Sequence, residues 1–232
     1  IDGTLTDRST GEIVPSAREA LTRLEENGHF VAIATGRAHY KARKFTDANG
    51  FKNMVCCGGN GCVIDNELVE NIPLDKDGCI KIIHQAEELG YGWCVALDDT
   101  KDVYMTDDKF LRQVGKRKEP TRYIIDDMLE VEKADAIYKV YVAIPKEDEE
   151  KLTTKELVGH LRFEPEYLMF QPDNKRGGII KMMEHLNADI KDVVVFGDDY
   201  NDMDMFCPEW FSIAMGNACQ DLKDIANYVR SE

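Results

Sequence analysis

Carboxylate and amide side chains crowd one short segment late in the chain. Residues 197–204 read Gly-Asp-Asp-Tyr-Asn-Asp-Met-Asp and directly follow the apolar run 193–196. So many carboxylates in one loop repel one another, and a bound cation offsets that repulsion. A hard cation that is held by few protein oxygens, with positions left for water and phosphate, fits Mg²⁺. The segment therefore predicts a magnesium site that also takes a phosphate group.

A calcium-binding EF-hand is the main alternative for such a segment. If its loop began at Asp199, the fifth position would be Met203, which cannot serve as an oxygen ligand. The sixth position would be Asp204, where the sharp turn of an EF-hand requires glycine. The EF-hand is therefore excluded.

Other polar residues occupy comparable places along the chain. Asp2 lies in an Asp-Gly-Thr turn, Thr35 follows the apolar run 30–34, and Lys175 precedes a helical pattern. Each signal alone is weak, because a Thr after a strand usually only turns the chain and a single Lys usually lies on the surface. The carboxyl ends of parallel strands converge on one edge of a sheet, where open α/β sheets bind ligands. The joint order of these residues therefore predicts one shared site.

Two features of this group favour an anionic ligand. Thr35 and Gly36 offer a hydroxyl and a backbone N–H at the start of a helix, where the helix dipole attracts negative charge. Lys175 adds a full positive charge. Because the chain has a formal charge of −15, from 44 acidic and 29 basic residues, an anionic substrate needs such local help.

The elements that must position these residues alternate between helix and strand. The first predicted helix opens with a Ser16/Glu19 capping box and has a buried stripe marked by Leu21 and Leu24. The predicted order is helix 16–27, strand 30–34, helix 38–48 and strand 54–57, and later helix 178–186, strand 193–196, a short helix near 203, strand 211–214 and a terminal helix. This alternation predicts an α/β fold with a doubly wound, Rossmann-like parallel sheet.

The middle of the chain has a different pattern of predicted helices and strands. Residues 72–171 combine a helical pattern over 81–89 with a strand-like run over 140–144. We interpret this segment as an inserted α+β domain. The core domain is then expected to comprise residues 1–71 and 172–232.

Composition limits the partners. The acidic surface repels nucleic acid phosphates and anionic membranes, and the longest apolar runs are far shorter than the roughly 20 residues of a membrane span. Seven cysteines are scattered without a Cys-x-x-Cys pair, which favours reduced thiols in the cytoplasm. We therefore expect a cytoplasmic protein, a monomer or small homo-oligomer, that acts on a small molecule rather than on nucleic acid or a membrane.

Taken together, the motifs resemble those of the haloacid dehalogenase-like (HAD) phosphatases, and most of all the Cof-type subfamily of sugar and metabolite phosphatases. The matching residues are Asp2-Gly3-Thr4-Leu5, Ala34-Thr35-Gly36-Arg37, Lys175 and Gly197-Asp198-x-x-Asn201-Asp202, with further likeness in Asn60-Gly61-Cys62-Val63-Ile64 and Ala214-Met215-Gly216-Asn217-Ala218. The resemblance implies a HAD-like core at both ends of the chain and a C2-type cap domain over 72–171. In this family the first motif is Asp-x-Asp-Gly-Thr, so the nucleophilic Asp and its strand are expected just before Ile1.

The resemblance also implies a role for each matching residue. Asp2 would be the general acid/base, and its backbone carbonyl would ligate Mg²⁺ beside the side chain of Asp198. The phosphate group would be bound by Thr35, Gly36, Lys175 and Asn201. Behind them, Asp202 would orient water, the phosphate or Lys175, and Arg37 would support the loop.

The implied activity is that of a Mg²⁺-dependent phosphomonoesterase. It would act on small phosphorylated metabolites, sugar phosphates above all, through an aspartyl-phosphate intermediate. A phosphosugar mutase of the same superfamily stays open, since it would share every motif and return the phosphoryl group to sugar. A non-catalytic, receiver-like phosphate-binding domain is the other alternative, although the large insertion and the Asp2-Gly3-Thr4 turn argue against it.

Overall fold

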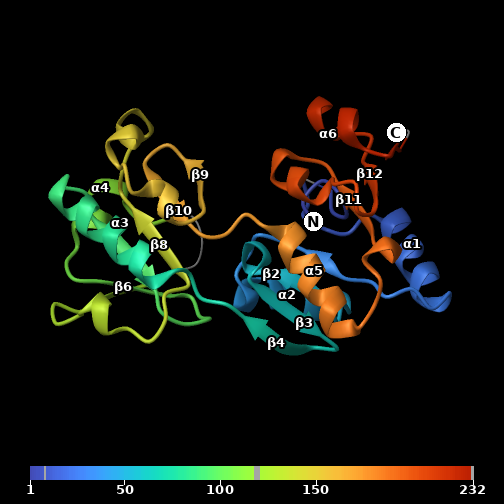
Figure 1. Ribbon diagram of the computed structural model, residues 1–232, viewed down its shortest axis with the longest axis horizontal. Coiled ribbons are helices and arrows are strands. Elements are labelled where there is room, and N and C mark those ends of the chain that lie inside the picture. The colour runs from blue at the N-terminus through green and yellow to red at the C-terminus, as the bar shows by residue number, and fades with distance from the viewer. Residues whose placement is uncertain (8, 118–120, 231–232) are drawn as a thin grey trace. The chain divides into compact units, whose positions relative to one another are not determined.

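The chain folds into two compact units (Figure 1), and the computed structural model describes residues 1–7, 9–117 and 121–230. The first unit comprises Ile1–Arg37, Phe45–Glu70 and Asn174–Glu232, and the second comprises Ala38–Lys44 and Asn71–Asp173. Both ends of the chain therefore build the first unit, while most of the middle builds the second.

The described strands of the first unit form two sheets. One sheet has the order β1 (Ile33–Ala34), β2 (Met54–Cys56), β3 (Gly61–Ile64) and β4 (Glu67–Asn71). The other has the order β11 (Val194–Gly197), β12 (Phe211–Ala214) and β13 (Tyr228–Val229). Strand β1 is parallel to β2, and β12 is parallel to both of its neighbours, whereas β2 and β3 form an antiparallel pair.

Helices alternate with the parallel strands of this unit. The bounds are α1 (Pro15–Glu26), α2 (His39–Asn49), α5 (Lys175–Leu186) and α6 (Gln220–Ile225), with 3-10 turns η1 (Cys57–Gly59), η5 (Ile190–Asp192) and η6 (Tyr200–Met205). The predicted α/β class with parallel strands is confirmed. In the part of the chain that the structure describes, no helix is both long enough and apolar enough to cross a membrane.

The strand expected over 30–34 is shorter than its apolar run suggests. Only Ile33–Ala34 pairs with β2, and the side chain of Phe30 is 47% exposed. The prediction of a strand over the whole run 30–34 is therefore wrong. Apolar character alone does not extend a strand where no partner strand supplies hydrogen bonds.

The first helix also begins differently from the prediction. It starts at Pro15, and no side chain caps it, so the expected Ser16/Glu19 capping box does not form. Proline suits the first helical position because its fixed φ is helical and its missing N–H would be unpaired there anyway. Leu21 and Leu24 are only half-buried, so the stripe that they mark is shallow.

The second unit contains a mixed six-stranded sheet in the order β7-β6-β5-β8-β10-β9. Its strands are β5 (Trp93–Ala96), β6 (Asp102–Met105), β7 (Arg122–Ile125), β8 (Lys139–Val142), β9 (His160–Glu164) and β10 (Tyr167–Phe170). Its helical segments are α3 (Lys76–Glu88), α4 (Lys109–Val114), η2 (Val131–Lys133), η3 (Lys146–Lys151) and η4 (Lys155–Leu157).

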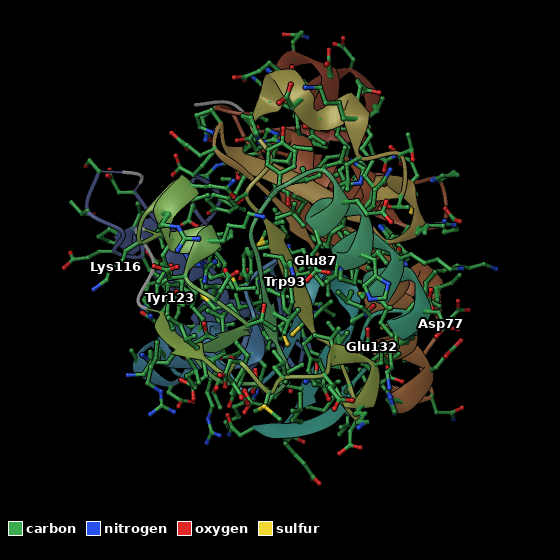
Figure 2. All side chains as sticks on the ribbon, turned by 90° about the vertical axis from the view of Figure 1, so that its left-hand side faces the viewer. Asp77, Glu87, Trp93, Lys116, Tyr123 and Glu132 are labelled. Carbon is green, nitrogen blue, oxygen red and sulfur yellow. The ribbon has the colours of Figure 1, made fainter. Side chains whose placement is uncertain are left out.

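Each face of this sheet has its own apolar cluster. Ile82 and Ile83 of α3 pack with Val140 on one face, and Phe110 of α4 packs on the other. The indole Nε1 of Trp93, on β5, donates a hydrogen bond to Glu87 of α3 at 2.8 Å, and Figure 2 labels both residues. The unit thus has a hydrophobic core that is separate from the first unit's clusters.

Helix α5 begins unusually close to the turn after β2. Gly59 has φ +107°, and a Cβ atom there would lie 1.9 Å from the carbonyl oxygen of Asn174. A Cβ atom on Gly178 would lie 2.4 Å from Val55. No side chain fits at either position, so the two glycines let α5 begin beside β2 and place Lys175 at its first position.

Candidate active site

Asp2 and Arg37 form a two-pronged ion pair. The Arg37 guanidinium donates from Nη2 to Oδ2 of Asp2 at 2.7 Å and to Oδ1 at 3.0 Å. The carboxylate side chain is 65% exposed, whereas that of Arg37 is 28% exposed. The backbone carbonyl of Arg37 accepts a hydrogen bond from Cys57 at 2.8 Å, which fixes the turn behind it. Asp2 therefore keeps a solvent-accessible carboxylate in a defined orientation.

Asp198, directly after β11, is a buried carboxylate at 2% exposure. Thr4 donates its hydroxyl to Oδ1 of Asp198 at 2.5 Å. The Asp198 backbone is held as well, because its N–H donates to Asp202 at 3.0 Å and its carbonyl accepts from Cys219 at 3.0 Å. The contact with Thr4 brings the Asp-Gly-Thr turn alongside the loop after β11.

Lys175 is the first residue of α5 and is 2% exposed. Its ammonium donates to the carbonyl oxygen of Asn201 at 2.5 Å and to Oδ1 of Asp202 at 2.7 Å. A buried ammonium needs such partners, since an unpaired buried charge is strongly unfavourable. The pairing fixes one positive charge beside the acidic loop.

Asp202 connects several parts of this loop. One of its oxygens accepts from Lys175, and the other accepts from the backbone N–H groups of Asp198 at 3.0 Å and Asp199 at 3.5 Å. Asp199 and Asp202 form a capping box that starts η6. Asp202 therefore orders the loop and Lys175 together.

Thr35 lies buried at the end of β1, at 6% exposure. Its N–H continues the pairing with β2 by donating to Val55 at 2.9 Å. Its hydroxyl oxygen accepts from the backbone N–H of Arg37 at 3.1 Å. Thr35 thus orders the turn that carries Gly36 and Arg37, and Arg37 links this turn to Asp2.

Hydrogen bonds link these groups across the chain. Thr4 of the Asp-Gly-Thr turn donates to Asp198, the backbone N–H of Asp198 donates to Asp202, and Asp202 accepts from Lys175. The start of the chain, the loop after β11 and the start of α5 are therefore brought together.

The donors that could hold a metal are few. Among residues 1–7, 9–117 and 121–230, no three His, Cys, Asp or Glu side chains gather into a metal-binding group. Asp198 offers one buried carboxylate, with the Asp-Gly-Thr turn beside it. Mg²⁺ commonly takes only one or two protein carboxylates, and waters and substrate phosphate complete its shell. The residues present therefore fit a magnesium ion and not a closed four-ligand zinc site.

Three residues around this site had no role assigned from sequence. Thr4 contacts Asp198, Asn217 donates from Nδ2 to the carbonyl of Gly3 at 3.0 Å, and Asp204 accepts from the first turn of α5. Thr4 and Asn217 stand inside segments that carried the family resemblance, so the motif itself was the available signal. Asp204 was one acid among several in a crowded loop.

The sequence matches a known family along the whole chain. The sequence profile of the haloacid dehalogenase-like hydrolases matches residues 1–232. The chain belongs to this family, as the motif resemblance predicted.

Two relatives align with nearly the whole chain. A Bacillus subtilis (strain 168) protein named "Putative phosphatase YkrA" is 28% identical over 232 residues, which cover 99% of this chain and 89% of that protein. Pyridoxal phosphate phosphatase YbhA of Escherichia coli (strain K12) is 28% identical over 251 residues, which cover 99% of this chain and 90% of that protein.

Solved structures share the fold. A crystal structure of a hypothetical protein from Geobacillus kaustophilus HTA426 superposes with a TM-score of 0.81 at 26% identity, covering 100% of this chain and 90% of that one. BT1666 from Bacteroides thetaiotaomicron, described among phosphatases of the HAD superfamily, gives a TM-score of 0.78 at 20% identity, covering 100% and 87%. The predicted fold class is thus confirmed, and the chain is a HAD-like phosphatase.

Proposed function

We propose that the protein is a Mg²⁺-dependent phosphomonoesterase that hydrolyses small phosphorylated metabolites, sugar phosphates in particular, through an aspartyl-phosphate intermediate. The observation that carries this proposal is the run of hydrogen bonds from Thr4 to Asp198, from Asp198 to Asp202 and from Lys175 to Asp202, which brings the turn of Asp2 together with Asp198 and Lys175. An acid/base, a metal-binding carboxylate and a fixed cation in one place are the groups that hydrolysis of a phosphate ester needs.

The nucleophile in this proposal is an Asp that precedes Ile1. Such a residue would lie next to Asp2, on the turn that Thr4 joins to Asp198. Strands β1 and β11 each lie at an end of their sheet order, so each offers an edge where the strand carrying that Asp can pair.

Asp2 moves the proton in both chemical steps. The nucleophilic carboxylate forms a bond to phosphorus while the ester P–O bond breaks, and the departing alkoxide takes the proton of Asp2. Water then attacks the phosphorus atom, gives its proton to Asp2 and releases inorganic phosphate with the free carboxylate. Arg37 orients Asp2 for both transfers through its two-pronged contact.

The phosphate oxygens are held by Thr35, Gly36, Lys175 and the side chain of Asn201. Lys175 contributes most to stabilising the transition state. Its ammonium is already fixed by Asp202, so it needs no further ordering when charge redistributes over the phosphate oxygens. The Asn201 carbonyl is engaged with Lys175, while the residue itself is exposed and its amide can reach a ligand.

Asp198 and the backbone carbonyl of Asp2 are the proposed Mg²⁺ ligands. When bound, the ion neutralises negative charge on the phosphoryl oxygens. Burial of Asp198 and its contact with Thr4 keep the carboxylate in place for that role. Asp202 supports it by accepting from the Asp198 backbone.

Residues 72–171 are proposed as a C2-type cap that selects the leaving group. Most of this segment forms a compact unit with its own six-stranded sheet, which supports its treatment as an inserted domain. A cap of this kind excludes bulk water when it closes. We place the enzyme in the cytoplasm as a monomer or small homo-oligomer, because its seven cysteines are all free thiols and its net charge of −15 disfavours nucleic acid and membranes.

The test is phosphate release from an aryl phosphate by a protein that carries the proposed upstream Asp. Turnover that needs Mg²⁺ and stops with a chelator supports the proposal, and an intact protein without such turnover refutes it. A screen of hexose, pentose, nucleotide and pyridoxal phosphates then defines the substrate, the last because the E. coli relative is named for it. Isomerised sugar phosphate without free phosphate would identify a mutase instead.

A further inference from the structure

The segment η6 holds Lys175 at both of its ends. The ammonium reaches the Asn201 carbonyl at 2.5 Å and Asp202 at 2.7 Å. At the backbone end, Asp204 of the same segment accepts at 2.9 Å from the N–H of Arg176, the residue next to Lys175. Six consecutive residues thus fix both the head and the base of one side chain.

The contact from Asp204 is a second cap at the start of α5, which the helix does not need for its own stability. Asn174 already caps α5 by accepting from Gly177 at 2.9 Å. Burial raises the pKa of Asp204, while the hydrogen bonds from the backbone and the charge of Lys175 act to lower it. Oδ1 of Asp204 is buried and has no hydrogen-bond partner among the described residues. A buried oxygen without a partner is unfavourable, so capping alone does not account for a carboxylate at this position.

The side chain of Arg176 does not serve as the partner of this carboxylate. Its guanidinium pairs with Glu209, while its backbone N–H pairs with Asp204. The two contacts are therefore separable by mutation: one pairs the Arg176 side chain with Glu209, and the other fixes the backbone beside Lys175.

We propose that Asp204 is a positioning residue for Lys175, fixing its backbone so that the ammonium meets the phosphate group. The inference rests on the proposed function and deepens it. A lysine has a flexible four-carbon stem, and anchoring both ends leaves that stem little freedom. A shift of about 1 Å in a positioning group can lower the rate about 100-fold, so the base of Lys175 matters as much as its head.

The experiment compares Asp204→Ala, Asp204→Asn and the matched control Glu209→Gln in the full chain. Asp204→Ala should lower kcat/KM about 10- to 100-fold and raise the inhibition constant of inorganic phosphate about tenfold. Asp204→Asn keeps an acceptor oxygen and should recover most of both, because Asn and Asp cap helices about equally well. Glu209→Gln should leave both values within about threefold of wild type, since it weakens the ion pair of the Arg176 side chain but leaves the backbone N–H of Arg176 on Asp204.

Hydrogen exchange at the first amides of α5 should rise in Asp204→Ala alone. If that variant does not fold, Asp204→Ser, whose hydroxyl is too short to span the same distance, takes its place with the same expected loss. Unchanged phosphate inhibition in the folded variant, or an equal loss in Glu209→Gln, would overturn the proposal. If wild type releases no phosphate, the proposed function fails, and calorimetric binding of inorganic phosphate with Mg²⁺ still decides whether Asp204 positions Lys175.

Discussion

The Arg37 guanidinium holds both oxygens of the Asp2 carboxylate, at 2.7 Å and 3.0 Å. The pair joins the turn after β1 to the Asp-Gly-Thr turn at the start of the chain. Its carboxylate is 65% exposed, and exposed ion pairs contribute only about 0–1 kcal/mol to stability. The contact therefore matters for the orientation of Asp2 and much less for the fold.

Replacing Arg37 should lower the activity and leave the stability of the fold nearly unchanged. Arg37→Ala is expected to lower kcat about 10- to 100-fold, because Asp2 loses its orientation. The free energy of unfolding should change by less than about 1 kcal/mol. Arg37→Lys, which keeps the charge but has a shorter side chain without the planar guanidinium, should fall between the two. Urea unfolding and steady-state kinetics measure both effects, and an unchanged kcat in Arg37→Ala would show that the pair has no role in turnover.

Replacing Lys175 should affect stability as well as activity. Lys175→Met leaves the Asp202 carboxylate buried without its cation, since the two side chains are 3% and 11% exposed. Breaking a buried pair in this way costs about 3–5 kcal/mol. We expect a large drop in the unfolding free energy together with loss of phosphate release, measured by urea denaturation and by the release assay.

A second substitution tests this explanation. Asp202→Asn in the Lys175→Met background removes the stranded charge but keeps an acceptor for the backbone of Asp198. Most of the lost stability should return, because the uncompensated charge is gone, while activity should stay absent. A double variant as unstable as Lys175→Met would mean that the buried charge was not the cause.

The close approach at Gly59 predicts an effect on Lys175 from outside the site. Gly59→Ala places a Cβ atom 1.9 Å from the carbonyl oxygen of Asn174, so the start of α5 has to move. Gly28→Ala is the matched control, since Gly28 also has positive φ but has no atom within 4 Å of the added Cβ. The control should cost only the backbone strain of about 1–2 kcal/mol and keep its kcat. Gly59→Ala should lose both stability and activity, and equal kcat in the two variants would exclude the steric explanation.

Buried thiols in the second unit predict a pH dependence of stability. Burial is the main cause that raises the pKa of Cys79 from its ordinary value of 9.0 to about 12. Because the folded pKa is the higher one, the protonated thiol contributes stability that is complete below about pH 9 and is lost as pH rises toward 12. The unfolding free energy of wild type should therefore fall over that range more steeply than that of Cys79→Ala. Parallel slopes in urea denaturation would contradict the shift.

Part of the site follows from residue order. Asp2, Lys175 and Asp198 each stand at a turn or helix start, and contacts through Thr4 and Asp202 connect these segments. The residues behind them were harder to infer, because their contacts are made across the chain. The Asp198 partner Thr4 is 194 positions away, and the partner of Asp204 is on α5, 28 positions away.

Local signals failed where a partner was needed to decide the outcome. The run 30–34 is apolar throughout, yet only Ile33–Ala34 finds hydrogen bonds from β2. Ser16 and Glu19 fit a capping box by type, but Pro15 occupies the first position of α1 and shifts the helix start. A glycine indicates where the backbone can adopt an unusual conformation, but it does not show which atoms lie close to it. Nothing in the local sequence at Gly59 shows that Asn174 lies against it.

The most direct test of the central claim is a Mg²⁺ titration of phosphate release in wild type, Asp198→Ala and Asp192→Ala. Asp192 is an exposed carboxylate of η5 and serves as the charge-matched control. Wild type and Asp192→Ala should show the same saturable dependence on Mg²⁺, while Asp198→Ala should release no phosphate at any concentration. Mg²⁺-independent turnover in wild type, or a normal titration in Asp198→Ala, would contradict the assignment of this site.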